Sequence, residues 1–246
     1  MNEQNGHPER IVPDDTSSGI IAIYLKRYDF AHEFVAGKRV LGVACGVGYG
    51  THYLAEAAHF VVGADIDTSA IHYAIHRYGE AANLAFMQTD AGKLPFATSG
   101  FDVVCSFETI EHLPDVESYL KEVRRVLAPG GIFLLSTPAA RRTTHSPANP
   151  HHLQEWTSAD FRSLLAEYFP SVTMYSQFRR MTRLATLIKD LDVFKLRTKV
   201  SLSLTRAVAH SVGVQSTGDV DIKDVLIVPD VQSNASEIVV VCSVRN

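Results

Sequence analysis

The sequence predicts an α/β protein with one mostly parallel sheet of seven strands and helices on both faces of that sheet. Two observations lead to this prediction. Short apolar runs alternate with segments of helical periodicity along most of the chain, and a glycine-rich turn at 44–50 follows the first of these runs. At 246 residues the chain is long enough for one such domain with additions. The expected strands are 39–43, 60–64, 84–88, 101–107, 132–136, 171–176 and 238–244.

Helices are expected before and between these strands. Thr68 or Ser69 is expected to cap the third helix, because a side-chain oxygen there can accept one of the unpaired N–H groups of the first turn. Thr157 and Asp160 have the spacing of a capping box. Residues 129–131, Pro-Gly-Gly, are expected to stop the fourth helix. The expected helices are 19–35, 51–58, 69–78, 115–127 and 157–168.

The chain is expected to divide into three parts. An N-terminal segment and helix covers 1–36, a core covers 37–177 with 223–246, and a helical insertion or lid covers 178–222. The insertion is indicated by residues 178–206, which carry eight Lys or Arg against two Asp in a chain of formal net charge −4. Apolar residues within this stretch recur at the spacing of an amphipathic helix.

Composition narrows the classes of function. The negative net charge disfavours a nucleic-acid partner, whose phosphates attract basic proteins. The three cysteines form neither a CxxC pair nor a disulfide framework. No apolar segment reaches the length of a membrane span or has the form of a signal peptide, so a cytoplasmic location is expected.

Two motifs indicate an adenosine-containing cofactor. The sequence VLGVACGVGYG at 40–50 allows backbone to approach a ligand closely, and Asp65 ends the second strand, where a carboxylate accepts hydrogen bonds from ribose hydroxyls. Asp90 follows the third strand near the same edge. The third glycine, Gly50, comes one residue too early for an NAD fingerprint, and Thr51 stands in its place. Two carboxylates suit a ribose and an adenine amino group but repel a pyrophosphate.

The same residues are part of a longer resemblance. The segments VLGVACGVGYG, VVGADID, the Asp90 segment with KLPF, FDVVCSFETIEHLPD and RVLAPGGIFLLSTP occur in this order between residues 38 and 138. In order and spacing the chain resembles the class I S-adenosylmethionine-dependent methyltransferases, a group that includes many small-molecule and sugar O-methyltransferases. The resemblance implies a Rossmann-like sheet, an enzyme, and S-adenosyl-L-methionine as cofactor.

The resemblance also assigns roles to residues at the carboxyl ends of the strands. The glycine turn is expected to pass under the methionine part of the cofactor, Asp65 to hold the ribose, Ile66 to lie against the adenine and Asp90 to accept from its amino group. Gly42 departs from the family, which commonly has an acidic residue there, so weaker or differently arranged cofactor binding is expected. The expected cofactor-binding residues are Ala44, Gly46, Gly48, Asp65, Ile66, Asp90, Ala91, Ser106 and Phe107.

The acceptor side is expected to follow the fourth strand. His112 is the preferred general base, because an ordinary imidazole titrates near working pH, although it also suits a structural role bonded to backbone. Glu111 is the second candidate, as a base or as a scaffolding carboxylate. Glu108 and the polar loop 141–156 are expected to contact the acceptor, with His151, His152 and Glu155 as its contact residues. No metal is expected, because adjacent histidines rarely ligate one ion; a site from His145, His151, His152 and Glu155 is the lesser alternative.

These expectations combine into one hypothesis with named competitors. The chain is interpreted as a methyltransferase that O-methylates a sugar hydroxyl or a similar small hydroxylated acceptor, nucleotide- or lipid-linked acceptors included, by in-line displacement with general-base help. An N- or C-methyltransferase is the alternative within the class. An NAD-dependent oxidoreductase and a non-catalytic cofactor-binding protein are the alternatives from other classes.

Overall fold

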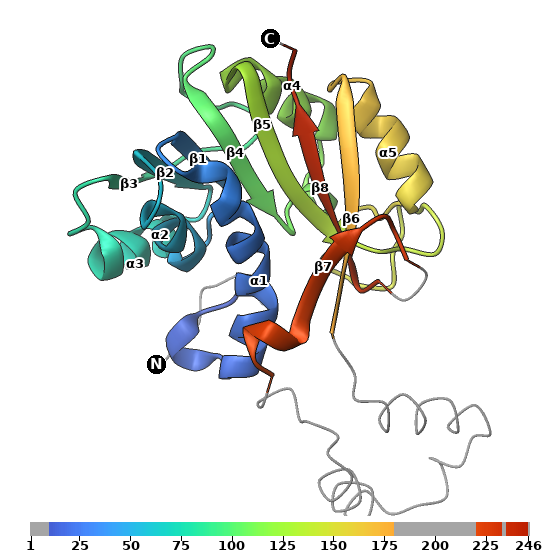
Figure 1. The fold of residues 1–246 in the computed structure, drawn as a ribbon, viewed down its shortest axis with the longest axis horizontal. Coiled ribbons are helices and arrows are strands. Elements are labelled where there is room, and N and C mark those ends of the chain that lie inside the picture. The colour runs from blue at the N-terminus through green and yellow to red at the C-terminus, as the bar shows by residue number, and fades with distance from the viewer. Residues whose placement is uncertain (1–9, 180–219, 233–234, 246) are drawn as a thin grey trace, which may run out of the picture.

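The computed structural model describes residues 10–179, 220–232 and 235–245, which form one mixed sheet of eight strands in the order β3-β2-β1-β4-β5-β8-β6-β7 (Figure 1). The strands are β1 (Arg39–Val43), β2 (Phe60–Asp65), β3 (Leu84–Gln88), β4 (Phe101–Phe107), β5 (Leu127–Pro138), β6 (Ser171–Arg179), β7 (Val225–Pro229) and β8 (Glu237–Ser243). The helices are α1 (Ser18–Val35), α2 (Tyr49–Ala55), α3 (Thr68–Tyr78), α4 (Val116–Val126) and α5 (Ser158–Ala166), with short 3-10 helices η1 (Pro13–Asp15), η2 (Ile110–His112) and η6 (Ile222–Asp224).

The first five strands are parallel, as expected, whereas β8 pairs antiparallel with β5, and β6 antiparallel with β8. The strand order reverses between β1 and β4, so the crevice beyond the carboxyl ends of these two strands is the position where doubly wound sheets bind ligands. β4 and β5 run downward in Figure 1 toward this edge, and α1 lies beside it and rises to the start of β1.

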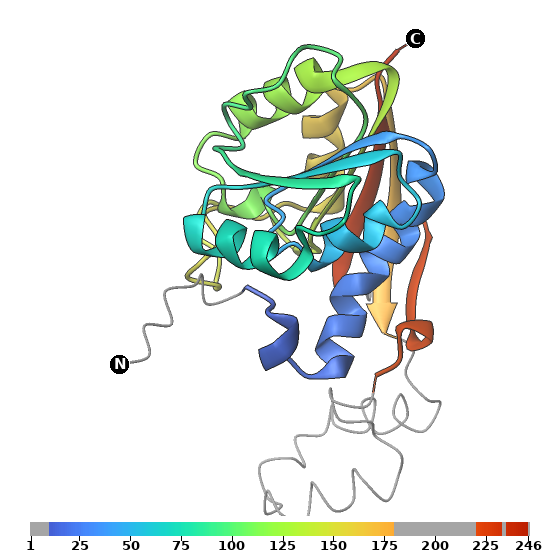
Figure 2. The same cartoon turned by 90° about the vertical axis from the view of Figure 1, so that its left-hand side faces the viewer.

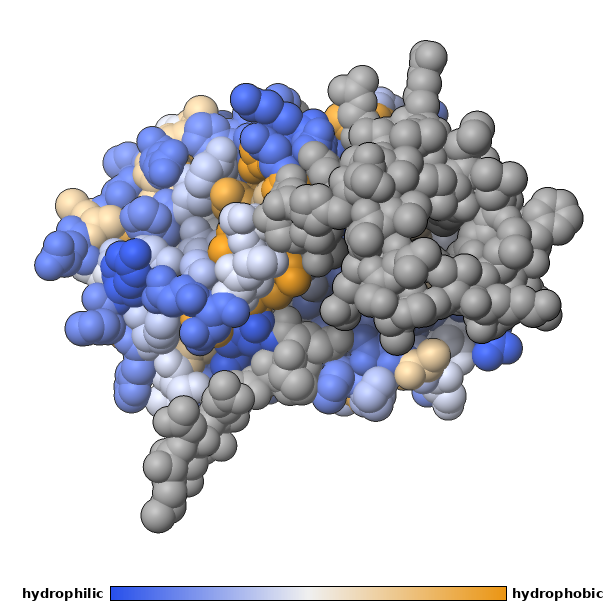
Figure 3. Space-filling model, turned by 90° about the horizontal axis from the view of Figure 1, so that it is seen from below, coloured by the Kyte–Doolittle hydropathy of each residue, from blue (hydrophilic) through white to orange (hydrophobic). Residues whose placement is uncertain are grey.

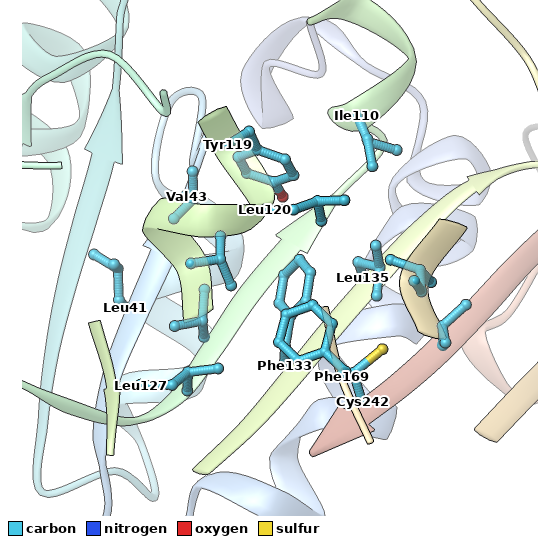
Figure 4. Close-up of a cluster of buried hydrophobic side chains, with 14 of the residues drawn as sticks. Leu41, Val43, Ile110, Tyr119, Leu120, Leu127, Phe133, Leu135, Phe169 and Cys242 are labelled. Carbon is cyan, nitrogen blue, oxygen red and sulfur yellow. The ribbon is translucent and has the colours of Figure 1, made fainter. Parts of the chain in front are cut away.

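Helices cover both faces of the sheet (Figure 2). Neighbouring residues of β4 show the two layers, because successive side chains of a strand point to opposite faces. Val103 packs with α1 and α2, whereas Val104 packs with α4 and α5. Figure 4 shows the second layer, where Tyr119 and Leu120 of α4 lie over Phe133 of β5. Burial of each large apolar side chain in these layers contributes roughly 1.5–3 kcal/mol to folding.

The strand prediction is wrong in number, because β7 was not expected. This strand is short, with the five residues VLIVP, and it ends in proline. β6 extends to Arg179, beyond the expected end at 176, and its outer edge supplies the hydrogen-bonding partner for β7, with Arg179 opposite Val225. An edge strand of this kind depends on a partner that is distant in sequence, so local pattern does not reveal it.

Two details of the helix predictions are also corrected. Asp67 caps α3 in place of Thr68 or Ser69, because its carboxylate accepts the N–H groups of Ser69 and Ala70 at 2.7 and 3.0 Å. α4 ends at Val126, before the Pro-Gly-Gly segment, which lies inside β5. The strand begins there because Leu127 pairs with Phe101, with a register shift before Val103 pairs with Ile132.

Of the expected insertion at 178–222, residues 180–219 lie outside the described residues, and Arg179 and Ile222 belong to β6 and η6. Among the helices that the structure describes, none is both long enough and apolar enough to cross a membrane. Figure 3 views the molecule from below, on the side toward which β4 and β5 run, and shows apolar residues among a mainly hydrophilic surface where it is not grey.

Candidate active site

The turn between β1 and α2 has the backbone conformation that its glycines allow. Ala44, Gly46 and Gly48 all have positive φ, at 52°, 54° and 83°. A Cβ at Gly48 would lie 2.7 Å from the Phe86 ring, so glycine is required there for packing as well as for conformation. A Cβ at Gly46 would meet nothing nearer than Arg10 Cγ at 4.0 Å. The space above Gly46 is therefore open to a ligand, and the segment around Arg10 borders it.

Asp65 is held rigidly beside this turn. Its carboxylate accepts the Gly46 N–H at 2.8 Å and the Asp67 N–H at 2.9 Å, one on each oxygen, and the residue is 8% exposed. Each carboxylate oxygen has a second lone pair, so the two can still accept from a diol. The geometry fits a ribose.

The neighbouring residues fit the adenine end of such a ligand. Ile66 is 67% exposed and presents apolar side-chain surface directly after Asp65. Asp90 is exposed at the same edge after β3, with one carboxylate oxygen accepting the Gly92 N–H at 2.8 Å, and Ala91 packs against the core. The residues expected to hold the adenosine part therefore lie at the ends of adjacent strands.

Gly42 has a structural partner that the sequence alone does not reveal. A Cβ at Gly42 would lie 3.0 Å from Thr51 Oγ1, and Thr51 is 1% exposed. A side chain at position 42 would therefore require a slight shift of the Thr51 side chain. Gly42 thus has Thr51 as a close packing neighbour.

Ser106 and Phe107, the expected cofactor residues at the end of β4, point to opposite faces of the sheet. The Ser106 side chain is 2% exposed beside Tyr119, on the α4 side, so only its backbone is near the strand edge. Phe107 points to the other face, where its ring meets Tyr28 of α1 edge-on with the ring centroids 5.0 Å apart. Helix α1 thus contributes directly to the wall of the site.

Glu108 links β4, β5 and α1. It is a non-glycine residue at φ +51°, a conformation that costs about 1–2 kcal/mol. Its N–H and its carboxylate both bond to Ser136, with the Ser136 hydroxyl donating to Oε1 at 2.7 Å. Arg27 Nη1 lies 3.3 Å from the same Oε1, and the Arg27 side chain is 1% exposed. Burial alone would lower the pKa of Arg27, but the charges of Glu108 and Glu237 raise it, so the guanidinium stays charged.

Glu111 is fully buried in η2 beneath the polar loop. Its Oε2 accepts the Thr137 hydroxyl at 3.1 Å, and its Oε1 has no hydrogen-bond partner. Burial, and then the charge of Glu108, raises the pKa of Glu111 well above its ordinary value. The Glu111 carbonyl accepts the Leu153 N–H at 2.8 Å, which fastens loop 141–156 against the end of β4.

His112 lies between η2 and this loop. Its Nδ1 is 2.9 Å from the His151 carbonyl oxygen, which can only accept, so Nδ1 carries the proton and Nε2 is the basic nitrogen of the neutral ring. The structural role and the catalytic role considered for His112 are therefore compatible, because the backbone bond fixes the tautomer in which Nε2 is the basic nitrogen.

The residues expected to contact the acceptor are arranged around His112. The His152 ring stands edge-on to it with the centroids 4.9 Å apart. His152 Nδ1 is 2.7 Å from Glu155 Oε1, and its Nε2 is 2.9 Å from Asn149 Nδ2. His151 supplies its backbone carbonyl, whereas its side chain is exposed.

Known proteins share this arrangement of motifs. A model of a methyltransferase domain matches residues 41–135. A probable S-adenosylmethionine-dependent methyltransferase of Mycobacterium tuberculosis is 30% identical over 211 residues, which cover 82% of this chain and 72% of that protein. The chain belongs to the S-adenosylmethionine-dependent methyltransferases. It is thus an enzyme, and its cofactor is S-adenosylmethionine.

Other similarities agree with this assignment. A probable S-adenosylmethionine-dependent methyltransferase of Mycolicibacterium smegmatis is 38% identical over 135 residues, which cover 53% of this chain and about half, 51%, of that relative. The fatty-acid O-methyltransferase of the same organism is 38% identical over 122 residues, covering 49% of this chain and 44% of that enzyme. The solved structure of a Thermotoga maritima S-adenosylmethionine-dependent methyltransferase superposes with a TM-score of 0.62 at 12% identity, covering 91% of this methyltransferase and 92% of that chain, which supports the Rossmann-like fold.

Proposed function

We propose that this methyltransferase methylates an oxygen atom, a hydroxyl of a sugar or of a lipid-type molecule. The observation that carries the proposal is His112, whose Nδ1–H is held by the His151 carbonyl so that Nε2 is the basic nitrogen at the edge where the acceptor binds. A hydroxyl is a weak nucleophile until it loses its proton, so an oxygen acceptor needs such a base.

The residues of the chain position the reactants and move the proton. S-adenosylmethionine supplies, when bound, a methyl group activated on a sulfonium. Asp65 and the glycine turn hold the adenosine and methionine parts at the ends of β1 and β2, and Phe107 and Glu108 border the acceptor side of the same crevice. His112 Nε2 takes the proton of the acceptor hydroxyl as the hydroxyl oxygen attacks the methyl carbon, in line with the C–S bond that breaks.

The relatives support an oxygen acceptor and widen its class. The name of the fatty-acid O-methyltransferase states oxygen methylation of a lipid, and that enzyme matches this chain over 122 residues. A sugar hydroxyl is the other acceptor that we propose. In both cases the reacting atom is oxygen, and the two acceptors differ in the molecule to which that oxygen belongs, a lipid or a sugar.

Methyl-labelled S-adenosylmethionine tests the proposal. The purified protein is incubated with an extract of its source cells, and the label is followed into lipid, glycan, small-molecule, protein and nucleic-acid fractions. Label in the lipid or glycan fraction is expected, as a methyl ether that survives mild alkali. A methyl ester that releases methanol would show a carboxylate acceptor, which needs no base, and would contradict a hydroxyl acceptor. Label held on nitrogen or carbon contradicts oxygen methylation.

A matched pair of variants tests the role of His112. His112→Gln removes the basic nitrogen, and we expect kcat to fall by about 10²–10⁴-fold with the Kd for S-adenosylhomocysteine unchanged. His76→Gln removes an exposed histidine from the last turn of α3, which is not part of the proposed site, and is expected to retain kcat within about threefold. Equal losses in both variants would contradict the role of His112 as the base.

A further inference from the structure

Three side chains at the acceptor edge converge in a pattern that the role of a single base does not explain. One potential ligand atom from each of Glu111, His112 and His152 lies within 4.8 Å of the other two. The residues come from η2 and from the loop that Glu111 anchors. The metal site that the sequence offered as the lesser alternative included His152 but not Glu111 or His112.

The first independent observation concerns the Oε1 atom of Glu111. The side chain is 0% exposed, yet this oxygen has no hydrogen-bond partner, while the other oxygen is bonded to Thr137. A buried carboxylate oxygen without a partner costs about 1–3 kcal/mol, so such groups in native proteins have a reason. A bound cation is such a reason, because it supplies both the missing partner of the oxygen and a compensating charge.

The second observation is how the two histidines are held. His112 Nδ1 bonds to a backbone carbonyl at 2.9 Å, and His152 Nδ1 bonds to the Glu155 carboxylate at 2.7 Å. Metal-ligating histidines characteristically donate one ring N–H to a carbonyl or carboxylate, which turns the other nitrogen toward the metal. Both rings satisfy this rule independently, through different partners.

We propose that Glu111, His112 and His152 bind a divalent transition-metal ion of the Zn²⁺ type. Two imidazoles and one carboxylate suit such an ion and leave coordination positions for an acceptor oxygen. The Asn149 amide, which now donates to His152 Nε2 at 2.9 Å, would move to admit the ion.

The inference rests on the proposed oxygen methylation and changes the route by which the proton of the acceptor hydroxyl leaves. An acceptor hydroxyl bound to a divalent cation loses its proton to solvent more readily, and the resulting alkoxide forms the new O–C bond as the C–S bond breaks. The ion keeps its oxidation state throughout. In the metal-loaded enzyme His112 then holds the ion and does not itself take the proton.

Binding of Co²⁺ to the full chain tests the site directly. The chain is first stripped of metal with a chelator, Co²⁺ is titrated while its visible absorption is recorded, and Zn²⁺ is added as competitor. We expect one Co²⁺ per chain, bands of a four- or five-coordinate ion, and displacement by Zn²⁺. Absence of saturable binding would overturn the proposal.

Variants locate the ion. Glu111→Gln and His152→Gln are expected to weaken Co²⁺ binding more than tenfold, and Glu155→Gln, which changes the partner of His152 Nδ1, about 10–100-fold. His76→Gln, at an exposed histidine in the last turn of α3, is the matched control and is expected to bind Co²⁺ unchanged. Because Glu155 is partly exposed, its variant tests the site even if Glu111→Gln fails to fold. Binding that survives His152→Gln and Glu155→Gln places the ion elsewhere and refutes the site.

Turnover separates this inference from the proposed function. If Co²⁺ binds at the site but no oxygen acceptor is methylated, the proposed function fails and the metal site stands. If the chelated enzyme, shown to be metal-free by elemental analysis, methylates an oxygen acceptor at full rate, the proposed function stands and the catalytic part of the metal proposal fails. Restoration of activity by Zn²⁺, by more than tenfold, supports both.

Discussion

Asp65→Asn is the sharpest test of how this methyltransferase holds its cofactor. In the free protein the two carboxylate oxygens each accept one backbone N–H, from Gly46 at 2.8 Å and from Asp67 at 2.9 Å. The amide of asparagine can accept only one of these, and its NH₂ group faces the other donor. The variant therefore loses the negative charge, one bond that orients the side chain, and one acceptor for the ribose diol.

The size of the effect follows from those bonds. A hydrogen bond to a charged group contributes about 1.5–3 kcal/mol, so losing one ribose bond and the charge raises the Kd for S-adenosylhomocysteine by about 10- to 150-fold. Isothermal titration calorimetry measures this change, with circular dichroism to show that the fold is retained. Asp102→Asn is the matched control, because Asp102 lies at the other end of β4, paired with Arg39. A change below about threefold in folded Asp65→Asn, well under the loss of one charged hydrogen bond, would refute the assignment of Asp65 to the ribose.

Three further predictions concern packing and charge. Gly50→Ala would place a Cβ 2.0 Å from the Tyr28 ring, so we expect a loss of about 1–3 kcal/mol in chemical denaturation, which Tyr28→Ala in the same chain partly relieves. Arg27→Met removes the buried partner of Glu108, and we expect unfolding free energy to fall by about 3–5 kcal/mol; a loss below about 1 kcal/mol would show that Glu108 does not need the guanidinium. Asp67→Ala removes the cap of α3 at a cost of about 1 kcal/mol. Burial acts to raise the pKa of Asp67, but the hydrogen bonds from Ser69 and Ala70 and the charge of Arg10 lower it below its ordinary value. The contribution of Asp67 to the free energy of unfolding is therefore full above about pH 4, the pKa in the unfolded chain, and is lost as the pH falls toward the lower pKa of the folded protein. The difference between wild type and Asp67→Ala should therefore shrink in acid, and a difference that stays constant from pH 7 to pH 3 would contradict this origin.

The local pattern of the sequence was sufficient to predict the elements that form the cofactor edge. Strands 39–43, 84–88 and 101–107 coincide with β1, β3 and β4, because short runs rich in apolar residues and bounded by glycine or a polar turn are typical of strands. The placement of Asp65 and Asp90 follows from the same strands, since parallel strands end at one edge. Strand β7 and the exact start of β5 did not follow, because both depend on pairing with strands far away in the chain.

By itself, then, the sequence predicted the fold class from its periodicity, and the resemblance of its motifs to the methyltransferases implied the methyl donor and the edge of the sheet at which we propose the chemistry. These predictions were possible because the motifs are local in the chain. Only the tertiary structure decided which side chains meet there. Arg27 reaches Glu108 from a helix 81 positions earlier in the chain, and His152 comes to His112 because the Glu111 carbonyl anchors its loop. The unpaired oxygen of Glu111 likewise exists only once Thr137 and the loop have buried it. Contacts of this kind depend on how distant segments pack, and no local pattern of residue types records them.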